Sequence, residues 1–153
     1  MRIGPVSTVI SVNVGQPRER AWAGIGCTSI EKTAVAGPVL ARTLGLAGDQ
    51  VSDTRHHGGA DKAVYAFARE DLDRWAAELG REIRDGQFGE NLTTSGYDVN
   101  EALVGERWRV GTALLEVAEV RIPCNDFKGW MRASGYDDTA WVRRFALVGR
   151  PGP

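Results

Sequence analysis

The 153-residue sequence has few of the residues that cross-link small domains or ligate metal ions. It contains only two cysteines, Cys27 and Cys124, which lie far apart, and two histidines, which are adjacent. This arrangement lacks the ligand spacing of a zinc site, and thiols in a chain without secretory features usually stay reduced. The sequence therefore argues against a disulfide-rich scaffold and gives no support for a structural zinc domain.

Long apolar runs and an excess of one charge are also missing. The 19 Lys and Arg residues nearly balance the 20 Asp and Glu residues, which leaves a net charge of -1. Proteins that bind nucleic acid polymers usually carry a basic excess, and a membrane span needs a run of about 20 apolar residues. The N-terminus has no signal-peptide pattern. We therefore expect a single cytoplasmic domain over residues 1–153, with neither nucleic acid nor a membrane as a partner.

Nineteen glycines separate short apolar runs, a pattern typical of many strands joined by turns. We expect strands over Val6–Val14 and Ala63–Phe67, and a hairpin of Glu106–Val110 and Ala113–Val120 around Gly111. These segments supply most of the sheet that the pattern indicates. The predicted fold is mainly β with a few short helices, in the α+β class.

Helical periodicity is confined to a few segments. Apolar residues spaced three and four apart predict a helix over Glu70–Leu79 that ends at Gly80. Phe127–Ala133 and Thr139–Leu147 are candidates for further short helices. No dinucleotide fingerprint, P-loop or nucleophile elbow is present.

Cys124 is the first candidate for chemistry. It follows Val120–Pro123, a predicted strand that the proline ends, because proline cannot donate a ladder hydrogen bond. The neighbouring guanidinium of Arg121 favours the thiolate, which is the form that binds metals or attacks electrophiles. The alternative is a small buried apolar side chain, and the local pattern does not decide between the two.

Two loops carry further candidate groups. His57, Gly58 and Gly59 precede Lys62, and adjacent glycines allow backbone N–H groups to converge on an anion. Glu90 and Asn91 could orient a heterocycle through hydrogen bonds. The alternative for each loop is an ordinary polar turn.

Four blocks of the sequence occur in an order and at spacings that match those of one known protein family. They are Thr28–Lys32 with Gly37–Val39, Gly45–Asp49 with His57–Tyr65, Gly86–Leu92, and Gly105–Gly111 with Arg121–Cys124. Together they resemble the MOSC family, which is named after the C-terminal domain of molybdenum-cofactor sulfurases. The resemblance covers roughly residues 8–150. Within the family, the chain is most similar to stand-alone bacterial proteins associated with resistance to hydroxylaminopurine-type base analogues.

The resemblance implies a MOSC-type β-barrel. Members of this type normally continue beyond a segment like Gly149–Gly152 with further strands, so we expect a barrel that is incomplete after Pro153. Unpaired sheet edges tend to pair with another chain. We therefore expect a homo-oligomer or a fragile monomer.

The resemblance also implies a ligand. Cys124 would be the catalytic residue and the metal ligand of a molybdenum cofactor (molybdopterin), whose dithiolene supplies further sulfur. Pyridoxal phosphate is not an expected cofactor. The other residues expected to bind the cofactor are Lys32, His57, Gly58, Lys62 and Arg121 near its phosphate, and Thr28, Glu90 and Asn91 around the pterin.

The expected activity is that of an oxidoreductase that reduces N-hydroxylated bases or related N-oxygenated compounds to amines, a detoxification reaction. Its partners would be the small-molecule substrate and a separate electron-donating reductase, because the sequence has no flavin or nicotinamide motif. Two alternatives stay open. In one, Cys124 is a persulfide sulfur carrier for metallocofactor assembly, and in the other the chain is a non-catalytic carrier of the cofactor.

Overall fold

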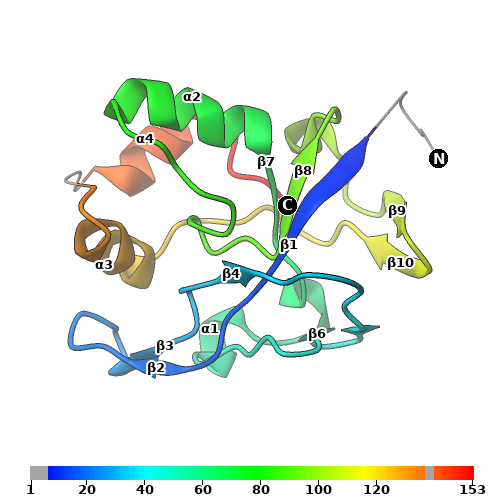
Figure 1. Ribbon diagram of the computed structural model, residues 1–153, viewed down its shortest axis with the longest axis horizontal. Helices are drawn as coiled ribbons and strands as arrows, with labels where there is room; N and C mark the ends of the chain where they lie inside the picture. Colours follow the sequence, from blue (N-terminus) through cyan, green and yellow to red (C-terminus); the bar gives the residue numbers. More distant parts are fainter. Residues whose placement is uncertain (1–6, 137–139) are drawn as a thin grey trace.

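The computed structural model describes residues 7–136 and 140–153. A central sheet separates a group of helices, α2, α3 and α4, from the β9–β10 hairpin (Figure 1). The strands are β1 (Thr8–Val14), β2 (Arg18–Glu19), β3 (Cys27–Thr28), β4 (Thr33–Ala34), β5 (Ala41–Arg42), β6 (Gly45–Leu46), β7 (Ala66–Ala68), β8 (Leu92–Ser95), β9 (Arg107–Val110) and β10 (Ala113–Glu116). The helices are α1 (Thr54–His57), α2 (Arg69–Leu79), α3 (Asn125–Ala133) and α4 (Trp141–Val148), with 3₁₀ turns η1 (Ala60–Lys62) and η2 (Val99–Glu101).

The central sheet has the strand order β4-β1-β8-β7. β1 is antiparallel to β4 and to β8, whereas β8 is parallel to β7. The remaining strands form three separate two-stranded sheets, so within the part of the chain that the structure describes the strands do not close into the expected barrel. The fold is a mixed α+β arrangement with many short strands and few helices.

Several expected elements are confirmed. β1 and α2 match their predictions, except that Val6, the predicted start of the first strand, lies outside the described residues, and Gly80 ends α2 in the left-handed conformation with a φ of 65°. The predicted hairpin around Gly111 is confirmed as β9–β10, but its second strand ends at Glu116 rather than at Val120. α3 spans nearly the predicted residues. The predicted helix over Thr139–Leu147 begins outside the described residues, and α4 covers the rest of it.

Two strand predictions are wrong in detail. The strand predicted over Ala63–Phe67 occupies residues 66–68, because η1 occupies the preceding turn. Residues 117–124 form no strand, so Cys124 does not end one. Pro123 has no N–H to donate, and the chain passes directly into α3.

Aromatic side chains from α2, α3, α4 and the loop before β8 form the main core. Phe88 lies at the centre of this cluster, with its ring centroid 5.2 Å from those of Phe67 and Phe127. Trp75 of α2 stacks on Phe145 of α4 at 5.2 Å. The cluster therefore fixes three helices against the sheet. Within the residues described, no helix is long and apolar enough to cross a membrane.

Residues 151–153 bind to β7 and to the segment before α3. The Ala66 N–H donates to the Pro153 carbonyl (2.9 Å), and the Arg121 N–H donates to the Gly152 carbonyl (2.9 Å). Gly152 has a φ of 76°, and a Cβ at this position would lie 2.3 Å from the Ala66 carbonyl oxygen. Close backbone approach therefore requires glycine at residue 152.

We predict that Gly152→Ala lowers the free energy of unfolding by more than about 2 kcal/mol, because it adds a backbone clash to the strain of a positive φ. Gly111→Ala is the matched control, since Gly111 also has a positive φ (58°) but has open space around it. The control should cost only about 1 kcal/mol. Denaturant titration measures both values, and equal losses would contradict the packing of residues 151–153.

Candidate functional site

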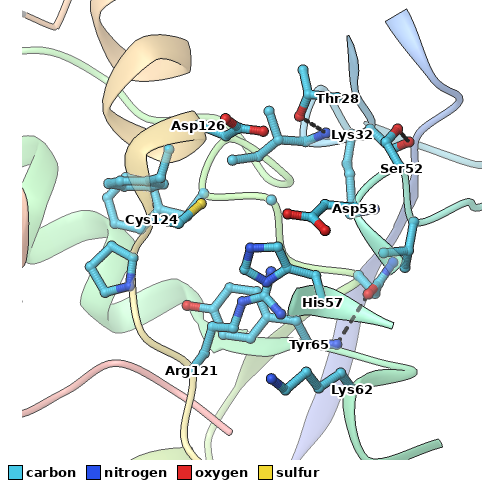
Figure 2. Close-up of a pocket in the computed structure, with 18 of the residues that line it drawn as sticks. Thr28, Lys32, Ser52, Asp53, His57, Lys62, Tyr65, Arg121, Cys124 and Asp126 are labelled. Carbon is cyan, nitrogen blue, oxygen red and sulfur yellow. Dashed lines mark hydrogen bonds between the residues drawn. The ribbon is translucent and has the colours of Figure 1, made fainter. Parts of the chain in front are cut away.

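A pocket opens where four segments that are distant in sequence meet. They are residues 28–32 from the end of β3, residues 49–65 around α1, residues 88–91 before β8, and residues 121–127 at the start of α3 (Figure 2). Most of the residues predicted from the sequence line it, namely Thr28, Lys32, His57, Lys62, Asn91, Arg121 and Cys124. Glu90 and Gly58 do not. The structure thus gathers most of the predicted set around one cavity.

Cys124 occupies the N-cap position of α3. Its side chain makes no capping hydrogen bond, and the thiol is free and only partly buried. In Figure 2 its sulfur points toward the middle of the pocket. The N–H groups of the first turn of α3 favour negative charge at this position, whereas the carboxylate of Asp126 opposes it. The sulfur is therefore accessible to a ligand from within the cavity.

A cationic end of the pocket is formed by Arg121, His57 and Lys62. The Arg121 guanidinium lies 5.3 Å from the centroid of the Tyr65 ring, and no carboxylate of residues 7–136 or 140–153 pairs with it. Lys62 donates to the His56 carbonyl (2.8 Å) and lies 3.5 Å from Glu119. Arg121 is therefore available to an anionic ligand.

At the cationic end of the pocket, His57 contributes an imidazole that can be neutral, whereas Arg121 and Lys62 contribute permanent charges. Burial lowers the pKa of His57, and the positive charge of Arg121 lowers it further, although Asp53 acts in the opposite direction. The imidazole is accordingly neutral at neutral pH. A neutral ring can both donate and accept a hydrogen bond.

The opposite end of the pocket is neutralised by an ion pair. The Lys32 ammonium lies 2.6 Å from the Asp49 carboxylate, and both side chains are almost fully buried. Asp49 also accepts hydrogen bonds from the Gly15 N–H (2.7 Å) and from the Asn91 side-chain amide (2.9 Å). The Asn91 side-chain oxygen accepts from the Tyr65 N–H (3.0 Å). The charge of Lys32 and the amide of Asn91 are therefore already engaged by the protein.

Asp49 is the main pocket residue that the sequence reasoning missed. It stands in the block Gly45–Asp49, which contributed to the family resemblance but received no role. The prediction of Lys32 as a pocket residue was one signal for Asp49, since a buried ammonium needs a carboxylate partner. The hydroxyls of Ser29 and Ser52, 2.6 Å apart at the pocket wall, were missed as well.

The structure does not support the role predicted for Glu90, which does not line the pocket. Its carboxylate is fully buried and accepts hydrogen bonds from the Gly86 N–H (2.6 Å), the Phe88 N–H (3.0 Å) and the Thr93 hydroxyl (3.0 Å). These bonds close the loop that presents Phe88 to the aromatic core. Glu90 therefore shapes the loop and does not line the pocket.

The role predicted for Gly58 is not supported either. Gly58 ends α1 with φ −96° and ψ 172°, and Gly59 follows with φ 100° and ψ 169°. An anion-binding nest needs successive right-handed and left-handed helical conformations, which these values exclude. A Cβ on Gly58 would lie 2.6 Å from the Thr54 carbonyl oxygen. Close packing of the α1 turn explains this glycine.

Comparisons with known proteins bear on the family and the fold of the chain. The family model of the MOSC domain matches residues 53–152. Protein YiiM of Escherichia coli is 35% identical over 100 residues, which are 63% of this chain and 45% of YiiM. A protein of Gibberella moniliformis named reductase is 32% identical over 151 residues, 94% of this chain and 25% of that protein. The crystal structure of YiiM from Geobacillus stearothermophilus superimposes with a TM-score of 0.73 and 27% identity, covering 96% of this chain and 65% of that one. The chain thus spans only part of each relative.

The buried carboxyl group of Glu90 should make the free energy of unfolding depend on pH. Burial raises the pKa of Glu90 to about 7, well above the ordinary value, so the folded state holds a proton that the unfolded state releases. The stabilisation is complete below about pH 4.5 and is lost as the pH rises through 7, a decrease of up to about 3 kcal/mol. Denaturant titration between pH 5 and about 8 measures this decrease.

Glu90→Gln cannot titrate, so we expect its free energy of unfolding to vary less over this pH range than that of the wild type. Glu101→Gln, at an exposed position on η2, serves as the control and should keep the wild-type slope. An unchanged slope in Glu90→Gln would show that the pH dependence comes from another group.

Proposed function

Because the chain belongs to the MOSC domain family, we propose that its pocket binds the molybdenum cofactor and reduces N-hydroxylated bases, or related N-oxygenated compounds, to amines. One observation carries this proposal. The free sulfur of Cys124 opens into a cavity that also contains Arg121, which has no carboxylate partner among the residues described. A soft donor and a separate cation suit a ligand that carries both a metal and a phosphate.

The donor set of the pocket fits such a group. No cluster of three or more His, Cys, Asp or Glu side chains that could hold a metal ion occurs in the described parts of the chain. A metal at Cys124 would therefore need most of its ligands from elsewhere, and the dithiolene of the cofactor supplies sulfur ligands of the right softness. Arg121, with Lys62 and His57 beside it, would hold the phosphate through charge-assisted hydrogen bonds.

When bound, the cofactor supplies the two-electron chemistry that removes the oxygen of an N-hydroxyl group. The overall reaction consumes two electrons and two protons and releases an amine and water. Cys124 would hold the metal, and Arg121 would orient the cofactor through its anionic group. His57 would donate a hydrogen bond from a ring nitrogen to this anionic group, since its neutral imidazole carries one N–H. Electrons come from a separate reductase, and the similarity to a protein named reductase supports reductive chemistry.

We predict that Cys124→Ser abolishes molybdenum retention in protein produced by a host that makes the cofactor, because a hydroxyl is a much weaker ligand than a thiolate. Cys27→Ser is the matched control, since Cys27 is also a free, partly buried thiol but does not line the pocket. Elemental analysis after gel filtration measures the metal content. Full retention by Cys124→Ser would contradict the proposal.

The same preparations test the alternative role of Cys124 as a sulfur carrier. A persulfide adds about 32 Da to the cysteine, which intact-protein mass spectrometry resolves. Metal-free protein that carries this adduct on Cys124 would overturn the cofactor proposal in favour of sulfur transfer.

Arg121 can be tested separately from the sulfur. We predict that Arg121→Met weakens cofactor retention by about tenfold to a hundredfold, the loss expected when a charged hydrogen bond to phosphate is removed. Competition with inorganic phosphate during dialysis measures this loss as molybdenum released. Arg107→Met is the control, because Arg107 lies on the exposed β9–β10 hairpin and pairs with Glu116. Equal phosphate sensitivity of the two variants would exclude Arg121 as the phosphate anchor.

A further inference from the structure

Asp49 joins three segments of the chain at one end of the pocket. Its carboxylate accepts hydrogen bonds from the Gly15 N–H at the end of β1, from the Lys32 ammonium before β4, and from the Asn91 amide before β8. The bonds are 2.7, 2.6 and 2.9 Å long, and only 4% of the Asp49 side chain is exposed. A carboxylate in this position must keep all three donors, because an unpaired buried charge is costly.

Lys32 depends on this carboxylate more than on any other group. Only 10% of its side chain is exposed, and burial lowers the pKa of its ammonium. Asp49 and Glu90 act in the opposite direction, whereas Arg121 lowers the pKa further. Of the two carboxylates, only Asp49 contacts the ammonium. The loss of Asp49 would leave the Lys32 ammonium buried with no contacting counter-ion among the described residues.

Asn91 depends on Asp49 for a hydrogen bond rather than for charge neutralisation. Its amide nitrogen donates to Asp49 and to the Asn13 carbonyl (3.2 Å), and its oxygen accepts from the Tyr65 N–H. These bonds fix the position of Tyr65, whose ring lies beneath the Arg121 guanidinium. Asp49 therefore affects both ends of the pocket. It contacts Lys32 directly, and it acts on Arg121 through Asn91 and Tyr65.

We propose that Asp49 is a positioning residue of the pocket, which keeps Lys32 charged and fixed and leaves Arg121 as the cation that meets an anionic ligand. This inference deepens the proposed function, since the ligand is the one proposed there. The state of Lys32, however, is a property of the protein alone and can be measured without any cofactor.

The test is the reactivity of each lysine toward acetic anhydride as a function of pH. Only an uncharged amine reacts, and the chain has just three lysines, Lys32, Lys62 and Lys128, which peptide mass spectrometry separates. In Asp49→Asn we expect Lys32 to react about tenfold faster, or more, than in the wild type at neutral pH, because removal of a contacting carboxylate favours the uncharged amine. Lys128, on α3, serves as the internal reference.

Asp71→Asn is the matched control variant. Asp71 is another buried carboxylate that pairs with a cation, at 2.6 Å from Arg150, but it lies outside the pocket. It should lose stability as Asp49→Asn does and leave the pH profile of Lys32 unchanged. Asp49→Glu retains the charge and should restore low reactivity. An unchanged Lys32 profile in folded Asp49→Asn, or the same shift in Asp71→Asn, would overturn the proposal.

If Asp49→Asn does not fold, Lys32→Met provides the test. This variant leaves the Asp49 carboxylate buried without its cation, so protonation should stabilise the fold. We then expect its free energy of unfolding to rise, relative to the wild type, as the pH falls from about 8 to about 5. No relative rise would contradict the proposal. A shifted Lys32 profile in protein that binds no molybdenum would support the role of Asp49 and refute the proposed function.

Discussion

The site depends on the packing of Phe127 against Phe88. The two rings meet edge to face, with centroids 5.2 Å apart, and join the first turn of α3 to the loop before β8. Trp141 and Phe145 of α4 contact both rings. Because Cys124 immediately precedes α3, this contact determines where its sulfur lies. The same two phenylalanines line the pocket, so the group that positions the thiol also forms the apolar wall beside it.

Charge is distributed unequally along this cavity. At one end the Lys32 ammonium is neutralised by Asp49, and at the other the Arg121 guanidinium lies over the face of Tyr65 and pairs with no carboxylate of the described residues. An anionic group entering the pocket is therefore attracted to the Arg121 end, while Cys124 offers sulfur to a metal. Under the proposed function, this unequal distribution of charge determines which way round a ligand binds. It arises because the buried Asp49 carboxylate neutralises Lys32, and not from the number of cations in the pocket.

The sequence was sufficient to predict the elements and residues that depend on local patterns. The amphipathic helix α2, the hairpin around Gly111, and the grouping of Cys124, Arg121 and His57 needed only periodicity, turn chemistry and a family-like order of blocks. Strand β8 was missed because its buried residues include Thr93 and Thr94, whose hydroxyls are satisfied by Glu90 and the Phe67 carbonyl. A pattern based on apolar residues does not detect such a strand.

Long-range contacts account for most of the remaining errors. The partners of Asp49 at Gly15 and Asn91 are 34 and 42 residues away in sequence, and the loop role of Glu90 depends on its folded neighbours. Arg121 was predicted to lie on a strand, whereas its backbone N–H pairs with Gly152, outside any assigned strand. Contacts of this kind form only once the chain has folded, so single-sequence patterns carry little information about them.

The central claim is that the Cys124 sulfur binds the metal of a cofactor seated in this pocket. X-ray absorption at the molybdenum edge, on protein loaded with the cofactor, measures the sulfur ligands of the metal directly. We expect one more sulfur ligand than the dithiolene supplies, and the loss of that ligand in Cys124→Ser. A metal with dithiolene sulfur alone in the wild-type protein would contradict the account.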